Sequence, residues 1–408
     1  MQTNLIPAYQ NTPDGIEAES ILRTCVHCGF CTATCPTYQL LGNELDSPRG
    51  RIYLIKEMLE GGPVTDRTVL HLDRCLTCRA CETTCPSGVQ YGRLVDIGRA
   101  IAEEKSPRGI ADKIRRGLLR LVLPQPLLFN SVLALGRVLR PLLPHAIANK
   151  IPVAQHPPAR PTTRHARGML VLEGCVQPGL APATNVAAAR VLDKLGISLL
   201  SAPAAGCCGA VSYHLNAHED GLDYMRRNID AWLPCIEQGA EAVVMTASGC
   251  GAMVKEYGHL LRNDKSYAEK AARISALTRD LSEILAAEQE NLLRVLVPAQ
   301  RGRVAFHAPC TLQHGQKITG VIEALLVRAG YELTQVQDKH LCCGSAGTYS
   351  ILQQDLSRQL LRNKLDALHS GNPAQIASAN IGCQTHLQSG TALPVRHWIE
   401  LLDEALPE

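Results

Sequence analysis

The stretches CVHCGFCTATCP, residues 25–36, and CLTCRACETTCP, residues 75–86, determine how the N-terminal part of this chain folds. Both follow the pattern Cys-x2-Cys-x2-Cys-x3-Cys-Pro. This spacing is typical of bacterial proteins with two [4Fe-4S] clusters, in which the fourth cysteine of each run binds the cluster of the other run. A loop with a thiol at every third residue reaches three irons of one cubane without strain.

The spacing therefore predicts two [4Fe-4S] clusters with crossed ligands. The expected ligand sets are Cys25, Cys28, Cys31 and Cys85 for one cluster, and Cys75, Cys78, Cys81 and Cys35 for the other. A zinc site or a redox disulfide would be the alternative for a single CxxC pair. Two complete copies, each ended by Cys-Pro, argue against both, so the chain is expected to carry electrons.

Composition favours a multidomain protein with reduced cysteines. A length of 408 residues suggests two or three domains, and 46% apolar residues suffice for real cores. The chain has 17 cysteines but no signal-peptide pattern, which favours metal-bound thiolates in the cytoplasm over disulfides. Its net charge of +3 is too small to indicate a nucleic-acid partner. No apolar stretch is long enough for a membrane-spanning helix, because polar residues and prolines interrupt residues 118–135.

The segment between the cysteine runs, DSPRGRIYLIKEMLEG at residues 46–61, predicts a helix that opens at Pro48. Its apolar positions at helical spacing are Ile52, Ile55, Met58 and Leu59. A second helical stretch, residues 68–75, leads into the second run. The module is therefore expected to be helix-rich, unlike compact βαβ ferredoxins. Arg49 and Arg51 are expected either to screen the negative charge of a cluster or to be ordinary surface residues.

A basic amphipathic segment follows. No acidic residue lies between Asp112 and Glu173, whereas the basic residues there are Lys113, Arg115, Arg116, Arg120, Arg137, Arg140, Lys150, Arg160, Arg164 and Arg167. Three interpretations remain open: binding to an anionic membrane surface, docking against a partner subunit, or connecting domains with a solvated face. Nucleic-acid binding is not expected, because residues 113–140 offer only Phe129 for base stacking.

The second half is duplicated. Copy one contains GMLVLEGC at residues 168–175, AGCCGA at 205–210 and MTASGCG at 245–251. Copy two contains RVAFHAPC at residues 303–310, LCCGSAG at 341–347 and SANIGC at 378–383. Apolar runs and helical stretches alternate in the same order in both. Each copy is therefore expected to be a small α/β unit with its cysteines at strand ends, where open α/β sheets place ligand sites.

Each copy offers four converging thiols, which suits a further iron–sulfur cluster, a zinc ion or a redox dithiol. The candidates are Cys175, Cys207, Cys208 and Cys250 in copy one, and Cys310, Cys342, Cys343 and Cys383 in copy two. Gly209 and Gly344 permit the tight turn that a Cys-Cys pair needs to present both thiols to one site. Cys235 lies outside the repeat and is expected to be a core residue.

The histidines are expected to form hydrogen bonds or to lie at the surface, not to bind metal. This applies to His214, His307, His314, His340, His386 and His397. His386 in copy two is replaced by Met253 in copy one. No catalytic residue is assigned, because the chain has no nucleophile elbow, P-loop or GxGxxG fingerprint. Substrate oxidation is therefore expected in another subunit.

The expected fold is multidomain: an α-helical two-cluster ferredoxin domain followed by a duplicated α/β CCG domain pair. The expected boundaries are residues 1–105 for the ferredoxin domain, 106–167 for the basic, Pro-rich connecting region, 168–300 for CCG copy one and 301–408 for CCG copy two.

This organisation resembles the iron–sulfur subunits of flavin-linked hydroxyacid and glycerol-3-phosphate dehydrogenases, and heterodisulfide reductase subunits share the CCG modules. The resemblance is closest to the glycolate oxidase (glycolate dehydrogenase) iron–sulfur subunits. It rests on the strings CVHCGFCTATCPTYQLLG, DSPRGRIYLIKE, CLTCRACETTCPSG, AGCCGAVSYHLNA, TASGCGA, LCCGSAGTYS and NIGCQTH.

The resemblance implies that partner subunits containing FAD oxidise glycolate to glyoxylate. This chain would pass the electrons through two [4Fe-4S] clusters towards membrane quinone, as a peripheral protein on the cytoplasmic face of the inner membrane. The alternatives are a related lactate or glycerol-3-phosphate dehydrogenase subunit, or a heterodisulfide- or quinone-reductase-like enzyme acting at the CCG repeats. Heterodisulfide reductase ends the CCG motif with CxxC, whereas this chain has Met253 and His386 at that place. A further cluster, a zinc ion and a redox thiol site all stay open there.

Overall fold

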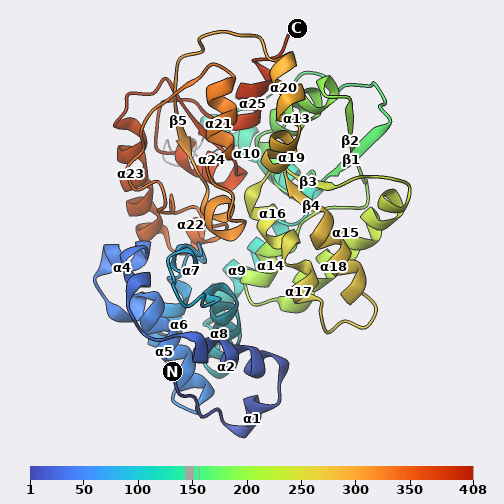
Figure 1. Ribbon diagram of the computed structural model, residues 1–408. Coiled ribbons are helices and arrows are strands. Elements are labelled where there is room, and N and C mark those ends of the chain that lie inside the picture. Colours follow the sequence, from blue (N-terminus) through green and yellow to red (C-terminus); the bar gives the residue numbers. More distant parts are fainter. Residues whose placement is uncertain (143–150, 156, 408) are drawn as a thin grey trace.

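The computed structural model describes residues 1–142, 151–155 and 157–407. Figure 1 shows a helical N-terminal module at one end of the molecule and two α/β units at the other. Lys150 of the basic segment lies outside the described residues.

Helices joined by loops make up the described regular structure of residues 1–105. They are α1 (Pro7–Gln10), α2 (Pro13–Thr24), α3 (Phe30–Ala33), α4 (Pro36–Leu41), η1 (Glu44–Asp46), α5 (Pro48–Leu59), α6 (Asp66–Asp73), α7 (Ala80–Thr83) and α8 (Tyr91–Lys105). The sequence predicted helices at residues 46–61 and 68–75, between the two cysteine runs. Both are confirmed, as α5 and α6. The side chains of Thr12, Ser47 and Thr65 accept hydrogen bonds from free backbone N–H groups at the starts of α2, α5 and α6.

The core of this module lies between α5 and α8. Ile55, Leu59, Leu94 and Val95 are fully buried there, and each such side chain stabilises the fold by about 1.5–3 kcal/mol. Gly98 makes this packing possible, because a Cβ atom at that position would lie 2.6 Å from the side chain of Ile55. The cysteine loops are thus carried by tightly packed helices.

The first α/β unit has a four-stranded parallel sheet with the order β2-β1-β3-β4. Its elements are β1 (Arg167–Val171), α12 (Gln177–Leu180), α13 (Ala183–Lys194), β2 (Ile197–Ser201), α14 (Ala210–His214), α15 (His218–Glu237), β3 (Val243–Met245), α16 (Ser248–Lys255), α17 (Tyr257–Leu260), α18 (Ala268–Leu277), β4 (Thr278–Asp280), α19 (Leu281–Ala287) and α20 (Gln289–Val295).

The second unit repeats the same topology in its sheet β6-β5-β7-β8, which is again parallel. Its elements are β5 (Arg303–His307), the π-helical turn η3 (Thr311–Gly315), α21 (Val321–Arg328), β6 (Glu332–Leu333), α22 (Tyr349–Leu352), α23 (Gln354–His369), β7 (Gln375–Ser378), α24 (Ile381–Gln388), β8 (Val395–His397) and α25 (Trp398–Asp403). The predicted duplication is therefore confirmed. The fourth strands, β4 and β8, were not predicted.

The two α/β units share one hydrophobic core. Leu192 of the first unit and Leu326, Trp398 and Leu402 of the second belong to the same buried cluster, and α13 packs against α25. This packing holds the two repeats side by side.

The helical module contacts both units, but in different ways. Glu256 of the first unit forms ion pairs with Arg79 at 3.1 Å and with Arg93 at 2.9 Å. In the second unit, by contrast, Cys310 and Cys342 share an apolar cluster with Cys78. The second cysteine run of the module therefore lies directly against the thiols of the second unit.

Two helices, α9 (Ile110–Val122) and α10 (Pro126–Leu139), follow the helical module. Among their basic residues, Arg116 is buried and pairs with Asp73 at 3.0 Å, Arg120 forms a surface ion pair with Asp220 at 2.6 Å, and Lys113 and Arg115 are exposed. Among the described residues no single helix is long and apolar enough to cross a membrane. The helices Ile110–Val122 and Pro126–Leu142, which are bent by 104° relative to each other, together have the length and composition of a membrane-spanning segment.

Candidate metal centres

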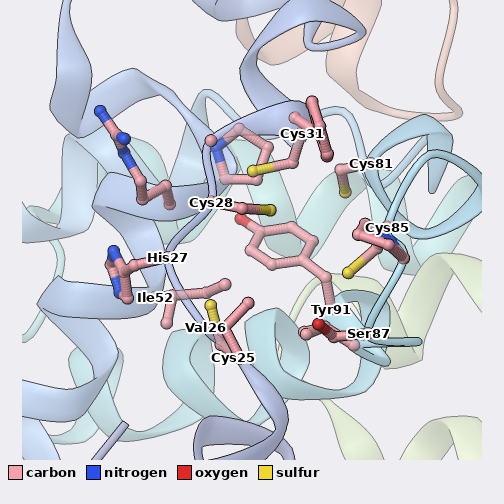
Figure 2. A pocket seen from close by; sticks show the side chains of 16 residues that line it. Cys25, Val26, His27, Cys28, Cys31, Ile52, Cys81, Cys85, Ser87 and Tyr91 are labelled. Atoms are coloured by element: carbon pink, nitrogen blue, oxygen red, sulfur yellow. The ribbon is translucent and has the colours of Figure 1, made fainter.

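The first cavity in the helical module is surrounded by thiols. Its lining includes Cys25, Cys28, Cys31, Cys81 and Cys85. In Figure 2 the labelled cysteines come from both runs and surround a common space beside Tyr91. The structure thus brings the fourth cysteine of the second run to the first three of the first run.

A second cavity lies nearby. Four cysteines line it, namely Cys35, Cys75, Cys78 and Cys81. The fourth cysteine of the first run therefore lies with the first three of the second run. The two cavities adjoin, because Cys81 lines both.

Both cysteine loops adopt the same unusual backbone conformation. His27 and Gly29 in the first run have φ angles of 59° and 86°, and Thr77 and Arg79 at the equivalent places of the second have 52° and 62°. Left-handed conformations of non-glycine residues cost free energy and persist where the surrounding structure imposes them, often at functional sites. The repeated conformation presents the thiols inward at both loops.

The cysteines of these cavities fit a cationic metal cluster. Burial, together with the neighbouring Cys25, raises the pKa of Cys31 to about 11, and burial raises the pKa of Cys81 well above its ordinary value. Without a compensating positive charge these thiols stay protonated. Iron supplies that charge, because metal binding stabilises the thiolate form.

Buried polar groups surround the second cavity. Arg51 is 1% exposed and donates to the His71 carbonyl, so the prediction that it could be a surface residue is wrong. Although burial opposes its charge, Tyr91, Cys75 and other neighbours raise the pKa of Arg51. Tyr91 donates to the Cys75 Sγ at 3.7 Å. These groups place positive charge and a hydrogen-bond donor beside the thiols.

Arg99 also belongs to this surrounding shell, and the sequence analysis missed it. Its guanidinium donates to the Cys75 carbonyl at 2.6 Å and to the Leu72 carbonyl at 3.1 Å. Arg99 lies on α8 at helical spacing from the buried residues Val95 and Ala102. The sequence did contain a sign of this role, because Arg99 is an arginine on an otherwise apolar helix face. Arg49, by contrast, lines the first cavity and pairs with Glu44 at 2.7 Å.

In the first α/β unit the four candidate thiols approach the carboxyl edge of the sheet. Cys175 follows β1, and Cys207 and Cys208 are buried in the loop after β2. Hydrogen bonds from Cys175 and Cys208 lower the pKa of Cys207 well below its ordinary value. Cys250 lies in the first turn of α16 and not at a strand end, so the sequence placed it wrongly.

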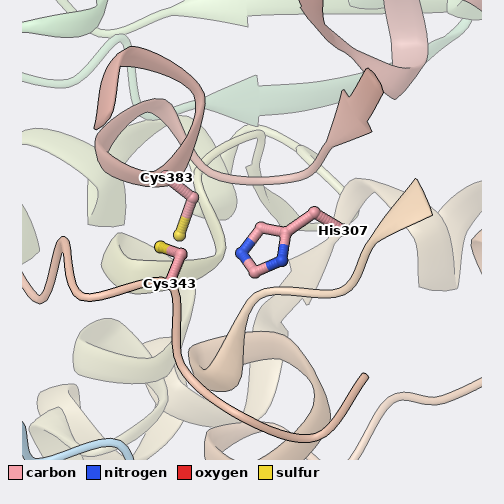
Figure 3. Close-up of side chains that lie close together, drawn as sticks. All are labelled: His307, Cys343 and Cys383. Atoms are coloured by element: carbon pink, nitrogen blue, oxygen red, sulfur yellow. The ribbon is translucent and has the colours of Figure 1, made fainter. Parts of the chain in front are cut away.

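The second unit buries all four of its thiols. The Sγ atoms of Cys310 and Cys342 lie 3.9 Å apart. Cys343 and Cys383 instead lie close to His307, and the three ligand atoms are all within 4.8 Å of one another (Figure 3). Cys383 occupies the first turn of α24 rather than a strand end, as Cys250 does in the first unit.

The turns at the Cys-Cys pairs need glycine, as predicted. Gly209 and Gly344 have φ angles of 87° and 90°. A Cβ atom at Gly344 would also lie 2.6 Å from the Ser357 carbonyl oxygen. Cys235 is half-buried against the core of the first unit.

Most of the singled-out histidines form the expected hydrogen bonds. Ring nitrogens of His214, His314, His386 and His397 pair with Asp96, Thr83, Ser357 and the Thr246 carbonyl, respectively. His307 differs. It is 2% exposed, and its buried Nε2 has no hydrogen-bond partner among the described residues. The prediction of a surface or hydrogen-bonding role therefore fails for this nitrogen.

Comparisons with known proteins follow the same division of the chain. The family model of the 4Fe-4S dicluster domain matches residues 21–89, and that of the cysteine-rich domain matches residues 169–255 and 304–388. The glycolate oxidase iron-sulfur subunit of Escherichia coli is 58% identical over 100% of this chain and 99% of its own length. The probable glycolate oxidase iron-sulfur subunit of Bacillus subtilis is 29% identical over 91% of this chain and 89% of its own. Lactate utilization protein A of Geobacillus thermodenitrificans is 30% identical over 54% of this chain and 92% of its own length.

Proposed function

The chain belongs to the family of glycolate oxidase iron–sulfur subunits, and on this premise we propose that it conducts electrons from glycolate, oxidised to glyoxylate at flavin in partner subunits, towards membrane quinone. It is the electron-transfer subunit of an oxidoreductase. The observation that supports this proposal most is the pair of adjoining cysteine-lined cavities in a module matched by a 4Fe-4S dicluster family.

We assign the cluster ligands from the cavity linings. Cys25, Cys28, Cys31 and Cys85 would hold one [4Fe-4S] cluster, and Cys75, Cys78, Cys81 and Cys35 the other. A cluster held there would supply one-electron redox chemistry. The protein contributes fixed thiols, a largely apolar surrounding and the shared wall at Cys81, which keeps the two sites adjacent.

The residues around the second site favour electron uptake there. Arg51 and Arg99 place two buried guanidinium groups beside the Cys75 segment, where they pair with Asp46 at 3.6 Å and Asp96 at 3.8 Å, and Tyr91 donates to the Cys75 Sγ. Positive charge and hydrogen bonds to ligand sulfur stabilise the reduced, more negative state. We therefore expect the second site to have the higher reduction potential of the two.

The decisive experiment uses the complex purified anaerobically with its flavin subunits. Addition of glycolate should reduce the clusters, as seen by electron paramagnetic resonance, whereas L-lactate and glycerol 3-phosphate in matched additions should reduce them much more slowly. No reduction by glycolate would refute the assignment. Faster reduction by L-lactate would favour a lactate dehydrogenase subunit, and faster reduction by glycerol 3-phosphate the corresponding dehydrogenase subunit.

We propose that the chain approaches the membrane through an apolar stripe on α9 and α10. The stripe consists of exposed side chains, namely Ile110, Ile114, Leu118, Leu121, Leu127, Val132, Leu135 and Val138. Leu127 is 86% exposed, and the exposed Lys113 and Arg115 lie in the same segment, so the outer face combines apolar side chains with basic ones. Such a face suits insertion at the boundary between lipid headgroups and acyl chains.

Vesicle flotation tests this surface. The double variant Leu118→Asp/Leu121→Asp should weaken binding to phosphatidylcholine–phosphatidylglycerol vesicles on the order of a hundredfold, because each leucine contributes about 1.5 kcal/mol. Leu293→Asp, at a 45% exposed leucine on α20, is the matched control and should bind normally. Unchanged flotation of the double variant would refute the proposal, and loss of the flavin subunits instead would identify the stripe as a subunit interface.

A further inference from the structure

A compact group of potential metal ligands lies at the carboxyl edge of the second sheet. One ring nitrogen of His307 and the Sγ atoms of Cys343 and Cys383 lie within 4.8 Å of one another, and all three residues are buried (Figure 3). They come from three separate segments: the end of β5, the Cys-Cys loop and the first turn of α24. We infer that the second α/β unit binds a single divalent metal ion of zinc type between these three side chains.

The state of His307 is the main evidence for a ligand. Its side chain is 2% exposed, and Nε2 has no hydrogen-bond partner among the described residues. Burying a polar nitrogen without a partner costs roughly 1–3 kcal/mol. A metal bound at this nitrogen would satisfy it, whereas a purely structural histidine would be expected to find a donor or acceptor.

The distances and the donor atoms suit one ion rather than a cubane. Zinc binds thiolate sulfur at about 2.3 Å and imidazole nitrogen at about 2.0–2.1 Å. Ligand atoms of a tetrahedral site are therefore roughly 3.5–4 Å apart, so a small inward movement closes the observed group around an ion. Three protein ligands leave a fourth position for water or another small ligand.

The other two thiols of the repeat do not complete this group. Cys310 and Cys342 lie 3.9 Å from each other and contact Cys78 of the helical module through a shared apolar cluster. The four thiols form a row in which Cys342 interacts with both Cys310 and Cys343, and only Cys343 and Cys383, at one end of the row, belong to the group with His307.

The first α/β unit provides an internal comparison. Leu172 occupies the position equivalent to His307, three residues before the first cysteine of its repeat, and it is buried in the core. An apolar side chain at this place removes the nitrogen ligand. The inferred site therefore belongs to the second unit and goes beyond the electron transfer proposed for the helical module.

Zinc K-edge X-ray absorption of the full-length chain, purified anaerobically and equilibrated with Zn²⁺, tests the site without interference from iron. The wild type should bind about one zinc per chain, with sulfur and imidazole scattering. His307→Leu, which installs the residue of the first unit, should lower zinc affinity at least tenfold. His307→Cys should restore binding with sulfur ligands only, which separates loss of a ligand from misfolding.

His386→Met is the matched control, because it also installs the residue of the first unit but at a histidine that pairs with Ser357 at 3.2 Å. It should retain zinc with the wild-type spectrum. The inference is overturned if the wild type binds no zinc, if its zinc shows no imidazole scattering, or if His307→Leu binds zinc as the wild type does. About twelve irons per chain instead of about eight, lost on substitution of Cys343, would also overturn it in favour of a third cluster.

Discussion

Replacement of Asp46 by asparagine should destabilise the helical module strongly. The Asp46 carboxylate is fully buried and contacts three basic side chains: His71 at 2.9 Å, Arg74 at 2.9 Å and Arg51 at 3.6 Å. Arg51 is itself buried. The variant Asp46→Asn keeps the shape of the side chain but removes its charge, which leaves the Arg51 guanidinium without a buried counter-charge.

The size of the effect follows from this burial. Removing one partner of a buried ion pair costs about 3–5 kcal/mol, and in a domain of about 100 residues each 1 kcal/mol lowers the melting temperature by about 4–8 °C. The expected decrease is therefore at least about 12 °C. The control is Glu44→Gln, in an ion pair with Arg49 whose partners are 44% and 36% exposed. Exposed pairs contribute less than about 1 kcal/mol.

The assay is loss of visible cluster absorbance on anaerobic heating at one fixed rate, because release of the clusters makes unfolding irreversible and the midpoint depends on the heating rate. Both variants are compared with the wild type in the same buffer. The reasoning is refuted if Asp46→Asn and Glu44→Gln lower the midpoint by the same few degrees.

Three further variants, one of them with a matched control, test other parts of the molecule. Burial lowers the pKa of His397 to about 4, so the unfolded chain binds a proton at a higher pH than the folded protein does. The free energy of unfolding should therefore fall by about 2 kcal/mol from pH 7 to pH 5. The variant His397→Gln should remove this part of the pH dependence, as monitored by Trp398 fluorescence. Trp232→Ala, at a fully buried side chain, should cost about 3–5 kcal/mol in urea unfolding of the first α/β unit. Arg99→Met should make one cluster potential more negative in a redox titration, and Arg93→Gln, at the interface with Glu256, should change it less.

Regular spacing made the cysteine loops and the main elements predictable. The run of apolar residues after Pro48 fills one helix face, and α5 begins at that proline. The repeated Cys-Cys pairs identified two copies, and both sheets have the same strand order. In these cases local pattern and tertiary packing favour the same conformation.

The missed features depend on contacts that local pattern does not contain. Strands β4 and β8 are three residues long and include charged side chains, so they form because β3 and β7 offer free sheet edges. The three interpretations of the basic segment could not be separated from the sequence, because the ion pairs of Arg116 with Asp73 and of Arg120 with Asp220 join distant parts of the chain. Which histidine faces the thiols likewise depends on three distant segments meeting at one sheet edge.

The duplication explains how one copy can acquire a metal ligand without losing its fold. The shared strand order brings the cysteine segments of each copy to the same sheet edge, whatever residue stands beside them. At that edge Leu172 extends the core of the first unit, whereas His307 places an unsatisfied nitrogen next to two thiols in the second. Topology therefore positions the thiols, and a single neighbouring residue decides whether a nitrogen ligand joins them.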